Sequence, residues 1–221
     1  MDKKVYCGAM LLASIVSTGC AEQKKVEEQK PNIIYFLVDD MGMGDLSLTG
    51  QKKYETPNID KLAADGMLFT NHYCGTTVSG PSRACLMTGK HTGHTSVRGN
   101  QPGPQLLGDN EATLASVLKG AGYKTAVIGK WGIGHPIPLD DPQRKGFDLS
   151  YGYLNMWHAH NCFPEFLYRN GVKEELTGNK LALAEDGTNP WADMPEGTGV
   201  ARMDARKQYA PDLFKKEALK F

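Results

Sequence analysis

Two neighbouring acids, Asp39 and Asp40, follow an apolar run and could hold a metal ion. Two carboxylates about 4 Å apart repel each other by roughly 4 kcal/mol at an effective dielectric constant near 20. A hard divalent cation removes this penalty and prefers oxygen ligands. The pair therefore indicates a cation site, whereas a solvated Asp-Gly turn is the alternative for the pair taken alone.

Ser79 and Arg83 could bind an anion, because they lie in the string SGPSRACLMTG that ends at Gly89. Pro81 fits the first turn of a helix, so Ser79 falls at a helix N-terminus, where free N–H groups and the helix dipole favour negative charge. Arg83 follows four residues later, which places it on the same helix face. The alternative is a capping serine beside a solvent-facing arginine.

Lys130 supplies a third charged group, at the end of the string GYKTAVIGKW that begins at Gly122. A lysine directly after a strand lies at the carboxyl rim of the sheet, where open α/β sheets bind their ligands. We expect it at the same rim as Asp39 and Asp40. The alternative is an ordinary surface lysine.

Strands alternating with helices must position these groups. Residues 32–38 (NIIYFLV) form an apolar run typical of a central strand, and residues 123–128 form a second one. Helices are predicted from Pro57, capped by Thr56 and ended by Gly66, and over 110–119. Their apolar faces comprise Ile59, Leu62, Ala63 and Gly66 in the first helix, and Leu114, Val117, Leu118 and Ala121 in the second. This order predicts an α/β fold with a mainly parallel sheet and flanking helices.

Two further segments complete this prediction. Residues 67–69 are expected to be extended. A last helix is expected from Pro211, with Phe214, Ala218 and Phe221 on its apolar face, and it breaks off within that stripe. We therefore expect either that the chain is a fragment or that its reading frame is truncated.

Composition excludes some classes of protein. Lys plus Arg and Asp plus Glu both number 25, so the formal net charge is zero and no nucleic-acid partner is expected. Hydrophobic residues make up 40% and charged residues 23%, as in a globular chain rather than a disordered one. No apolar run reaches the roughly 18 residues that a membrane-spanning helix needs.

The first 30 residues resemble an export address. Residues 1–20 combine a basic start, a short apolar core and the string STGC, which resembles a lipoprotein-type signal peptide with Cys20 as the lipidated residue. Ser17 stands where such signals usually carry leucine, and a plain secretory signal is the alternative. Residues 21–30 form a polar linker. We expect an exported protein in the periplasm or at the cell surface, attached to the membrane by its lipid anchor alone.

Together the three strings resemble the formylglycine-dependent, arylsulfatase-like sulfatases of the alkaline-phosphatase superfamily. That family carries Asp-Asp after an apolar strand, a Cys/Ser-x-Pro-Ser-Arg motif and a Gly-Lys-Trp motif, here ending at Asp40, Arg83 and Trp131. The resemblance implies that a maturase oxidises Ser79 to formylglycine, whose hydrated aldehyde attacks the sulfur of a sulfate monoester. It implies that Asp39, Asp40 and the modified Ser79 ligate Ca²⁺, or alternatively Mg²⁺.

The resemblance also assigns Arg83 and Lys130 to the nucleophile and the sulfate, on a sulfated glycan or an aryl sulfate as substrate. Gly132 replaces the histidine that many members carry, so His160 or His135 is a candidate for the missing contact, with ordinary surface histidines as the alternative. The family's later metal pair and second lysine fall beyond residue 221, so the resemblance implies that residues 31–221 are the N-terminal part of a sulfatase catalytic domain. Weak or absent activity is therefore expected of this chain alone. A phosphate or phosphonate ester hydrolase, and a lipid-anchored glycan-binding or vestigial protein, remain alternatives.

Overall fold

The structure is a computed structural model, and it describes residues 29–100, 107–108, 110–133 and 141–221. The predicted signal peptide, Cys20 and His135 lie outside these residues, as does most of the predicted linker. The chain divides into two compact units, residues 1–40 and 41–221, and each is described by itself. The described residues contain no helix long and apolar enough to cross a bilayer.

The described part of the first unit corrects one prediction. Residues 32–38 form no strand, and their side chains are exposed, from 46% for Leu37 to 81% for Phe36. A strand is completed by hydrogen bonds to a neighbour, and all four strands that the structure describes come from the second unit. Residues 32–38 therefore have the composition of a central strand, but in the described part of the chain they pair with no neighbouring strand.

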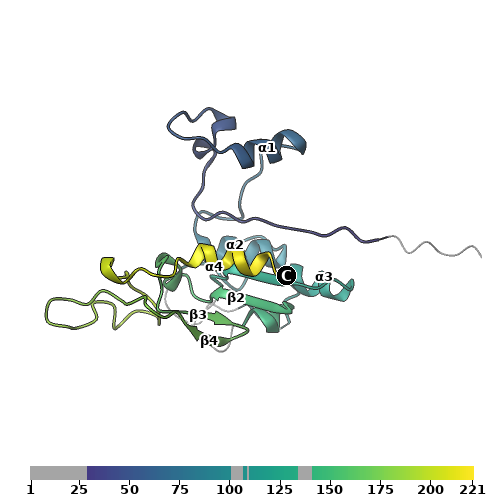
Figure 1. Ribbon diagram of the computed structural model, residues 1–221. Coiled ribbons are helices and arrows are strands. Elements are labelled where there is room, and N and C mark those ends of the chain that lie inside the picture. The colour runs from purple at the N-terminus through teal and green to yellow at the C-terminus, as the bar shows by residue number, and fades with distance from the viewer. Residues whose placement is uncertain (1–28, 101–106, 109, 134–140) are drawn as a thin grey trace, which may run out of the picture. The chain divides into compact units, whose positions relative to one another are not determined.

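The second unit is built on a sheet whose four strands follow the order of the sequence (Figure 1). The first two strands pair in parallel, the other pairs are antiparallel, and so the described sheet is mixed. Asn170 and Gly171, both with positive φ, make the tight turn between the last two strands. The strands are β1 (Ala126–Lys130), β2 (Leu149–Tyr153), β3 (Phe166–Arg169) and β4 (Val172–Glu175).

Among the residues that the structure describes, four α-helices and five short 3₁₀ helices accompany this sheet. The α-helices are α1 (Pro57–Asp65), α2 (Ser79–Thr88), α3 (Leu114–Gly120) and α4 (Ala210–Ala218). The 3₁₀ helices are η1 (Met43–Asp45), η2 (Ser47–Thr49), η3 (Pro142–Lys145), η4 (His158–His160) and η5 (Met203–Ala205).

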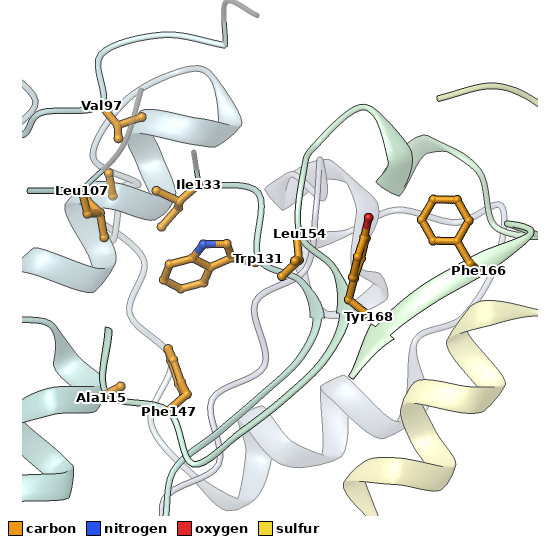
Figure 2. Close-up of a cluster of buried hydrophobic side chains, with 10 residues drawn as sticks. Val97, Leu107, Ala115, Trp131, Ile133, Phe147, Leu154, Phe166 and Tyr168 are labelled. Atoms are coloured by element: carbon orange, nitrogen blue, oxygen red, sulfur yellow. The ribbon is translucent and has the colours of Figure 1, made fainter. Parts of the chain in front are cut away.

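Side chains that alternate along the strands build a core on each face of the sheet. On one face Phe166 and Tyr168 share a cluster with Trp131 and with residues of α2 and α3 (Figure 2). On the other face Tyr151, Tyr153 and Leu167 pack against α4. Helices thus cover both faces, as the α/β prediction requires.

Helix α1 begins and ends as predicted, whereas α3 and α4 differ in detail. No residue of α1 is buried, although the apolar stripe predicted a covered face. Helix α3 begins at Leu114 rather than near residue 110, because Thr113 caps it by accepting the Ser116 N–H. Thr113 and Ala115 are buried there, while Leu114 and Val117 are exposed.

The inward face of α4 was predicted only in part. Phe214 packs as expected, but Ala218 and Phe221 are exposed. The buried positions are Ala210 and Glu217. The Glu217 carboxylate accepts two hydrogen bonds from Arg169 at 2.6 and 3.1 Å, so a charged pair occupies the place expected for an apolar contact. Residues 67–69 are exposed and belong to no strand.

Candidate active site

Helix α2 places Ser79 at its first position, as the sequence predicts. Val78 is the N-cap, and Gly89, with φ of 67°, ends the helix by donating its N–H to the Cys85 carbonyl at 2.8 Å. The left-handed conformation at Gly89 suits glycine and is a common helix stop. The serine hydroxyl therefore lies on the first turn, where backbone N–H groups lack helical acceptors.

Arg83 joins this turn to the end of β1. Its Nε donates to Ser79 Oγ at 3.0 Å, and its Nη1 donates to the Lys130 carbonyl at 2.7 Å. The arginine is only 8% exposed, so it does not face solvent as the alternative interpretation required. A planar guanidinium holds two acceptors in a fixed relation, and the two predicted motifs are thereby fixed to each other.

Lys130 is the last residue of β1, and the backbone after it continues the pairing with β2. Trp131 donates its N–H to the Tyr153 carbonyl at 2.9 Å, and Gly132 donates to the Leu154 carbonyl at 3.1 Å. The Trp131 ring is buried and meets Phe147 edge to face at 5.8 Å (Figure 2). The strand end that carries Lys130 is therefore held by backbone hydrogen bonds to β2 and by the packing of the Trp131 ring.

Gly132 lies against the stems of both cationic side chains. A Cβ atom at this position would stand 3.1 Å from Arg83 Cδ and 3.1 Å from Lys130 Cε. Its φ of 66° also favours glycine. A side chain at position 132 would therefore press on the arginine and lysine side chains.

Asp39 and Asp40 belong to the first unit, and their relation to Ser79 stays a prediction. Asp40 has φ of 54°, a left-handed conformation that is uncommon outside glycine and that Asp tolerates better than most residues. The described residues contain no group of three or more His, Cys, Asp or Glu side chains that could hold a metal ion. Two adjacent carboxylates nevertheless offer the hard oxygen ligands that Ca²⁺ and Mg²⁺ prefer.

Two histidines, His158 and His160, lie in the short helix η4. His160 is exposed in η4, with its ring edge-on to Trp157 at 6.2 Å, so its catalytic role stays a prediction. His158 is fully buried between Tyr153 and Phe166. Burial lowers the pKa of His158 to about 4, which keeps this histidine neutral at physiological pH.

One contact of the site was not foreseen. Asn100 accepts the Gly80 N–H at 2.8 Å, directly beside Ser79. Twenty residues separate this pair in the sequence, and no motif marks the asparagine.

Comparisons with known proteins identify the family of this chain. The sulfatase family model matches residues 31–198, which is more than half of the chain. The chain belongs to the sulfatase family. This sulfatase-family chain is 44% identical over 137 residues to N-acetylgalactosamine-6-sulfatase of Sus scrofa, a match over 58% of the chain and 26% of the relative. It is 45% identical over 123 residues to N-acetylgalactosamine-6-O-sulfatase of Bacteroides thetaiotaomicron, over 53% of the chain and 24% of the relative.

Solved structures support the fold of this sulfatase-family chain. One comes from work on the metabolism of multiple glycosaminoglycans by Bacteroides thetaiotaomicron and is designated BT33336S-sulf. It matches 88% of the chain and 48% of its own length, with 29% identity and a TM-score of 0.65. The expected alkaline-phosphatase-like α/β architecture is confirmed. The chain spans about a quarter of the length of the two curated relatives that it matches.

Proposed function

We propose that the protein is a formylglycine-dependent sulfatase that hydrolyses 6-O-sulfate monoesters of N-acetylhexosamines in sulfated glycans. The family and the fold support the reaction class. The names of two relatives, both 6-sulfatases of N-acetylgalactosamine, support the sugar and the position. An aryl sulfate is a simpler substrate for the same chemistry.

The Arg83 bridge between Ser79 and Lys130 is the observation that carries this proposal. A sulfate monoester is an anion, and an activated oxygen nucleophile is another. Cationic groups fixed beside the nucleophile offset their repulsion and stabilise the charge that develops in the transition state. A buried arginine on the serine hydroxyl, with a lysine on the adjoining strand end, supplies such groups.

Ser79 would be oxidised by a maturase to formylglycine, and Asp39 and Asp40 would hold a divalent cation together with it. When bound, that cation supplies charge that polarises an ester oxygen. The chain's own residues orient the reactants: Arg83 fixes the Ser79 side chain by one hydrogen bond. The Lys130 ammonium, on a strand end held by Tyr153, would attract the sulfate group.

The first test is the chemical state of Ser79 in protein made in a host that has the maturase. We expect mass spectrometry of the peptide containing Ser79 to show the loss of two hydrogens. The activity is then measured on matched sulfate and phosphate esters of one sugar. An unmodified serine without activity on either ester would favour the vestigial, glycan-binding alternative, and a preference for phosphate would favour the phosphatase.

The second test replaces the nucleophile. Ser79→Ala should lower kcat by at least ~10³-fold, on the scale of losing a core catalytic group. Ser150→Ala is a matched control, because the buried Ser150 hydroxyl has no hydrogen-bond partner in the described part of the chain. Full activity of Ser79→Ala would refute the assignment.

Export and anchoring complete the proposal. Residues 1–20 would direct secretion, and a lipid on Cys20 would hold the protein at the periplasmic face of a membrane or at the cell surface. The apolar core of these residues and the small residues before Cys20 support this. Replacing Cys20 by Ser should release the protein into the soluble fraction, as measured by detergent partitioning.

A further inference from the structure

The first turn of α2 lacks an ordinary cap. The N–H groups at the start of a helix have no helical acceptors, and an N-cap side chain usually satisfies one of them. The N-cap here is Val78, whose side chain accepts nothing. The Gly80 N–H instead donates to Asn100 Oδ1 at 2.8 Å. A distant asparagine therefore performs the capping role at the residue next to Ser79.

The asparagine lies directly on this turn. A Cβ atom at Gly80 would stand 2.9 Å from Asn100 Oδ1, 3.1 Å from the Gly99 carbonyl and 3.1 Å from Met156 Cε. Contacts below 3.0 Å force a neighbour to move, so only glycine leaves room for the asparagine to reach the backbone. The position after Ser79 thus depends on Asn100 for its hydrogen bond and on glycine for its space.

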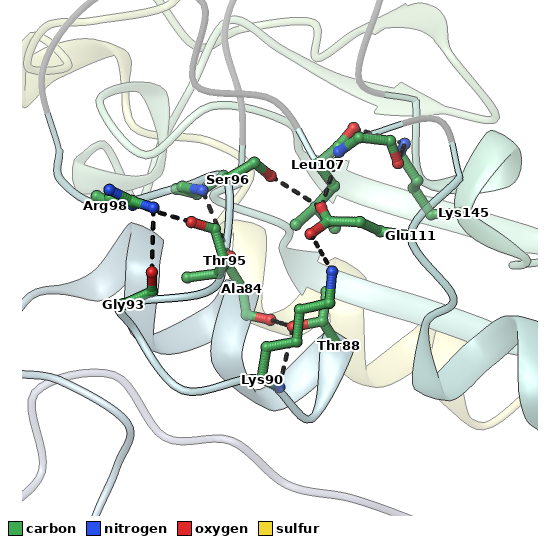
Figure 3. Close-up of polar contacts among 12 residues, drawn as sticks. Ala84, Thr88, Lys90, Gly93, Thr95, Ser96, Arg98, Leu107, Glu111 and Lys145 are labelled. Carbon is green, nitrogen blue, oxygen red and sulfur yellow. Dashed lines mark hydrogen bonds and ion pairs between the residues drawn. The ribbon is translucent and has the colours of Figure 1, made fainter.

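The segment that precedes Asn100 is tied down by hydrogen bonds and an ion pair (Figure 3). Arg98 donates to the Thr95 and Gly93 carbonyls at 3.2 and 3.1 Å. The Glu111 carboxylate accepts from Ser96 at 2.8 Å and pairs with Lys90 at 2.6 Å. The Thr95 and Val97 side chains are each 1% exposed. An acceptor on so well anchored a loop can fix the turn that it touches.

We propose that Asn100 is a positioning residue for Ser79: its amide oxygen fixes the first turn of α2 so that the Ser79 side chain meets Arg83. An amide suits this role because it accepts a hydrogen bond without carrying charge. A carboxylate would accept the same N–H, and would place a negative charge beside the point where the anionic ester binds. The role in turnover rests on the proposed function, whereas the role in the turn does not.

Three variants of the whole protein test this role. Asn100→Ala removes the acceptor, and kcat per formylglycine-containing site should fall roughly 10- to 100-fold, as expected for a misplaced nucleophile, with KM little changed. Asn100→Asp keeps the acceptor, so kcat should recover to within about 3-fold of wild type while KM rises about 10-fold through repulsion of the anion. Asn189→Ala is the matched control, since Asn189 Oδ1 also accepts one backbone N–H, from Trp191 at 2.9 Å.

Hydrogen exchange of the Gly80 N–H, measured without substrate, tests the turn itself. Exchange should be at least about 10-fold faster in Asn100→Ala and unchanged in Asn100→Asp and Asn189→Ala. Unchanged exchange in Asn100→Ala, or an undiminished kcat, would overturn the inference. A wild-type protein that cleaves no ester would overturn the proposed function instead, and the exchange rates would still decide whether Asn100 fixes the turn.

Discussion

Arg83 donates a hydrogen bond from Nε to the Ser79 hydroxyl at 3.0 Å. A cationic donor on a serine oxygen both orients the side chain and favours any negative charge that forms on it. The same guanidinium donates from Nη1 to the Lys130 carbonyl at 2.7 Å, so one side chain links the helix start to the strand end. Arg83 therefore contributes to the relative placement of the nucleophile and the lysine.

Arg83→Lys keeps the positive charge and removes the fork that reaches both acceptors. Lysine cannot donate along two fixed directions at once, so kcat/KM for a sulfate ester should fall by at least about 10²-fold. Steady-state kinetics of protein with verified formylglycine content would measure this. Arg202→Lys is the control, because Arg202 likewise donates to two acceptors, the two carboxylate oxygens of Asp204, and should leave kcat/KM within about 3-fold. Equal losses in both variants would contradict a special role for Arg83.

Gly132→Ala should impair activity beyond its effect on stability. Gly132 and Gly89 have nearly the same backbone conformation, with φ of 66° and 67°, so alanine at either should cost about 1 kcal/mol of unfolding free energy. A Cβ at Gly132 would press on Arg83 and Lys130 at 3.1 Å, whereas a Cβ at Gly89 would meet nothing within 4 Å.

Paired measurements separate the two effects of this substitution. Urea unfolding should give similar losses of stability for Gly132→Ala and Gly89→Ala. Only Gly132→Ala should lower kcat/KM, by roughly 10-fold or more, because small displacements of catalytic groups are costly. If both variants retained wild-type kinetics, the close packing of the cationic stems on Gly132 would not matter for turnover.

Local signals explain why part of the site was predictable. Helix α2 begins at Ser79 and ends at Gly89 because proline and glycine act on the backbone within a few residues. The four-residue spacing to Arg83 fixes a shared helix face wherever the helix lies. Lys130 follows the same logic, since a local apolar run marks the strand, although β1 covers Ala126–Lys130 rather than 123–128 and so includes the lysine.

Contacts between distant segments explain what the sequence did not reveal. Asn100 reaches Gly80 only because the loop between them folds back, and neither residue type announces a capping pair. Glu217 replaced an expected apolar contact because Arg169, on β3, supplies its partner. Residues 32–38 have strand-forming composition, but composition cannot supply the neighbour that a ladder requires.

Removal of the divalent cation should abolish turnover if Asp39 and Asp40 hold it. We expect EDTA treatment to eliminate activity, and added Ca²⁺ or Mg²⁺ to restore it. Asp40→Asn keeps the size of the side chain and removes one charged oxygen ligand, so the cation concentration for half-maximal activity should rise at least 10-fold. Asp45→Asn, an exposed acid a few residues on, should leave that concentration unchanged. Cation-independent activity would contradict the predicted site.

His158 should make stability depend on pH. Its ring is fully buried, and neither ring nitrogen has a hydrogen-bond partner in the described part of the chain. Burial lowers its pKa from 6.5 to about 4, against weaker opposing effects of Glu196 and of the Phe166 backbone, while Lys173 adds to the lowering. Between about pH 6.5 and pH 4, the unfolded chain therefore binds a proton at His158 that the native protein does not bind.

Stability contributed by neutral His158 is thus complete above about pH 6.5 and is lost as the pH falls towards 4, by roughly 3 kcal/mol in total. His158→Phe keeps an aromatic ring between Tyr153 and Phe166 and loses no hydrogen bond, so its unfolding free energy should decline much less over this range. Urea unfolding from pH 4 to 8 measures both curves. His160→Phe, which replaces an exposed histidine, should follow wild type. Parallel curves for His158→Phe and wild type would show that another group governs the acid sensitivity.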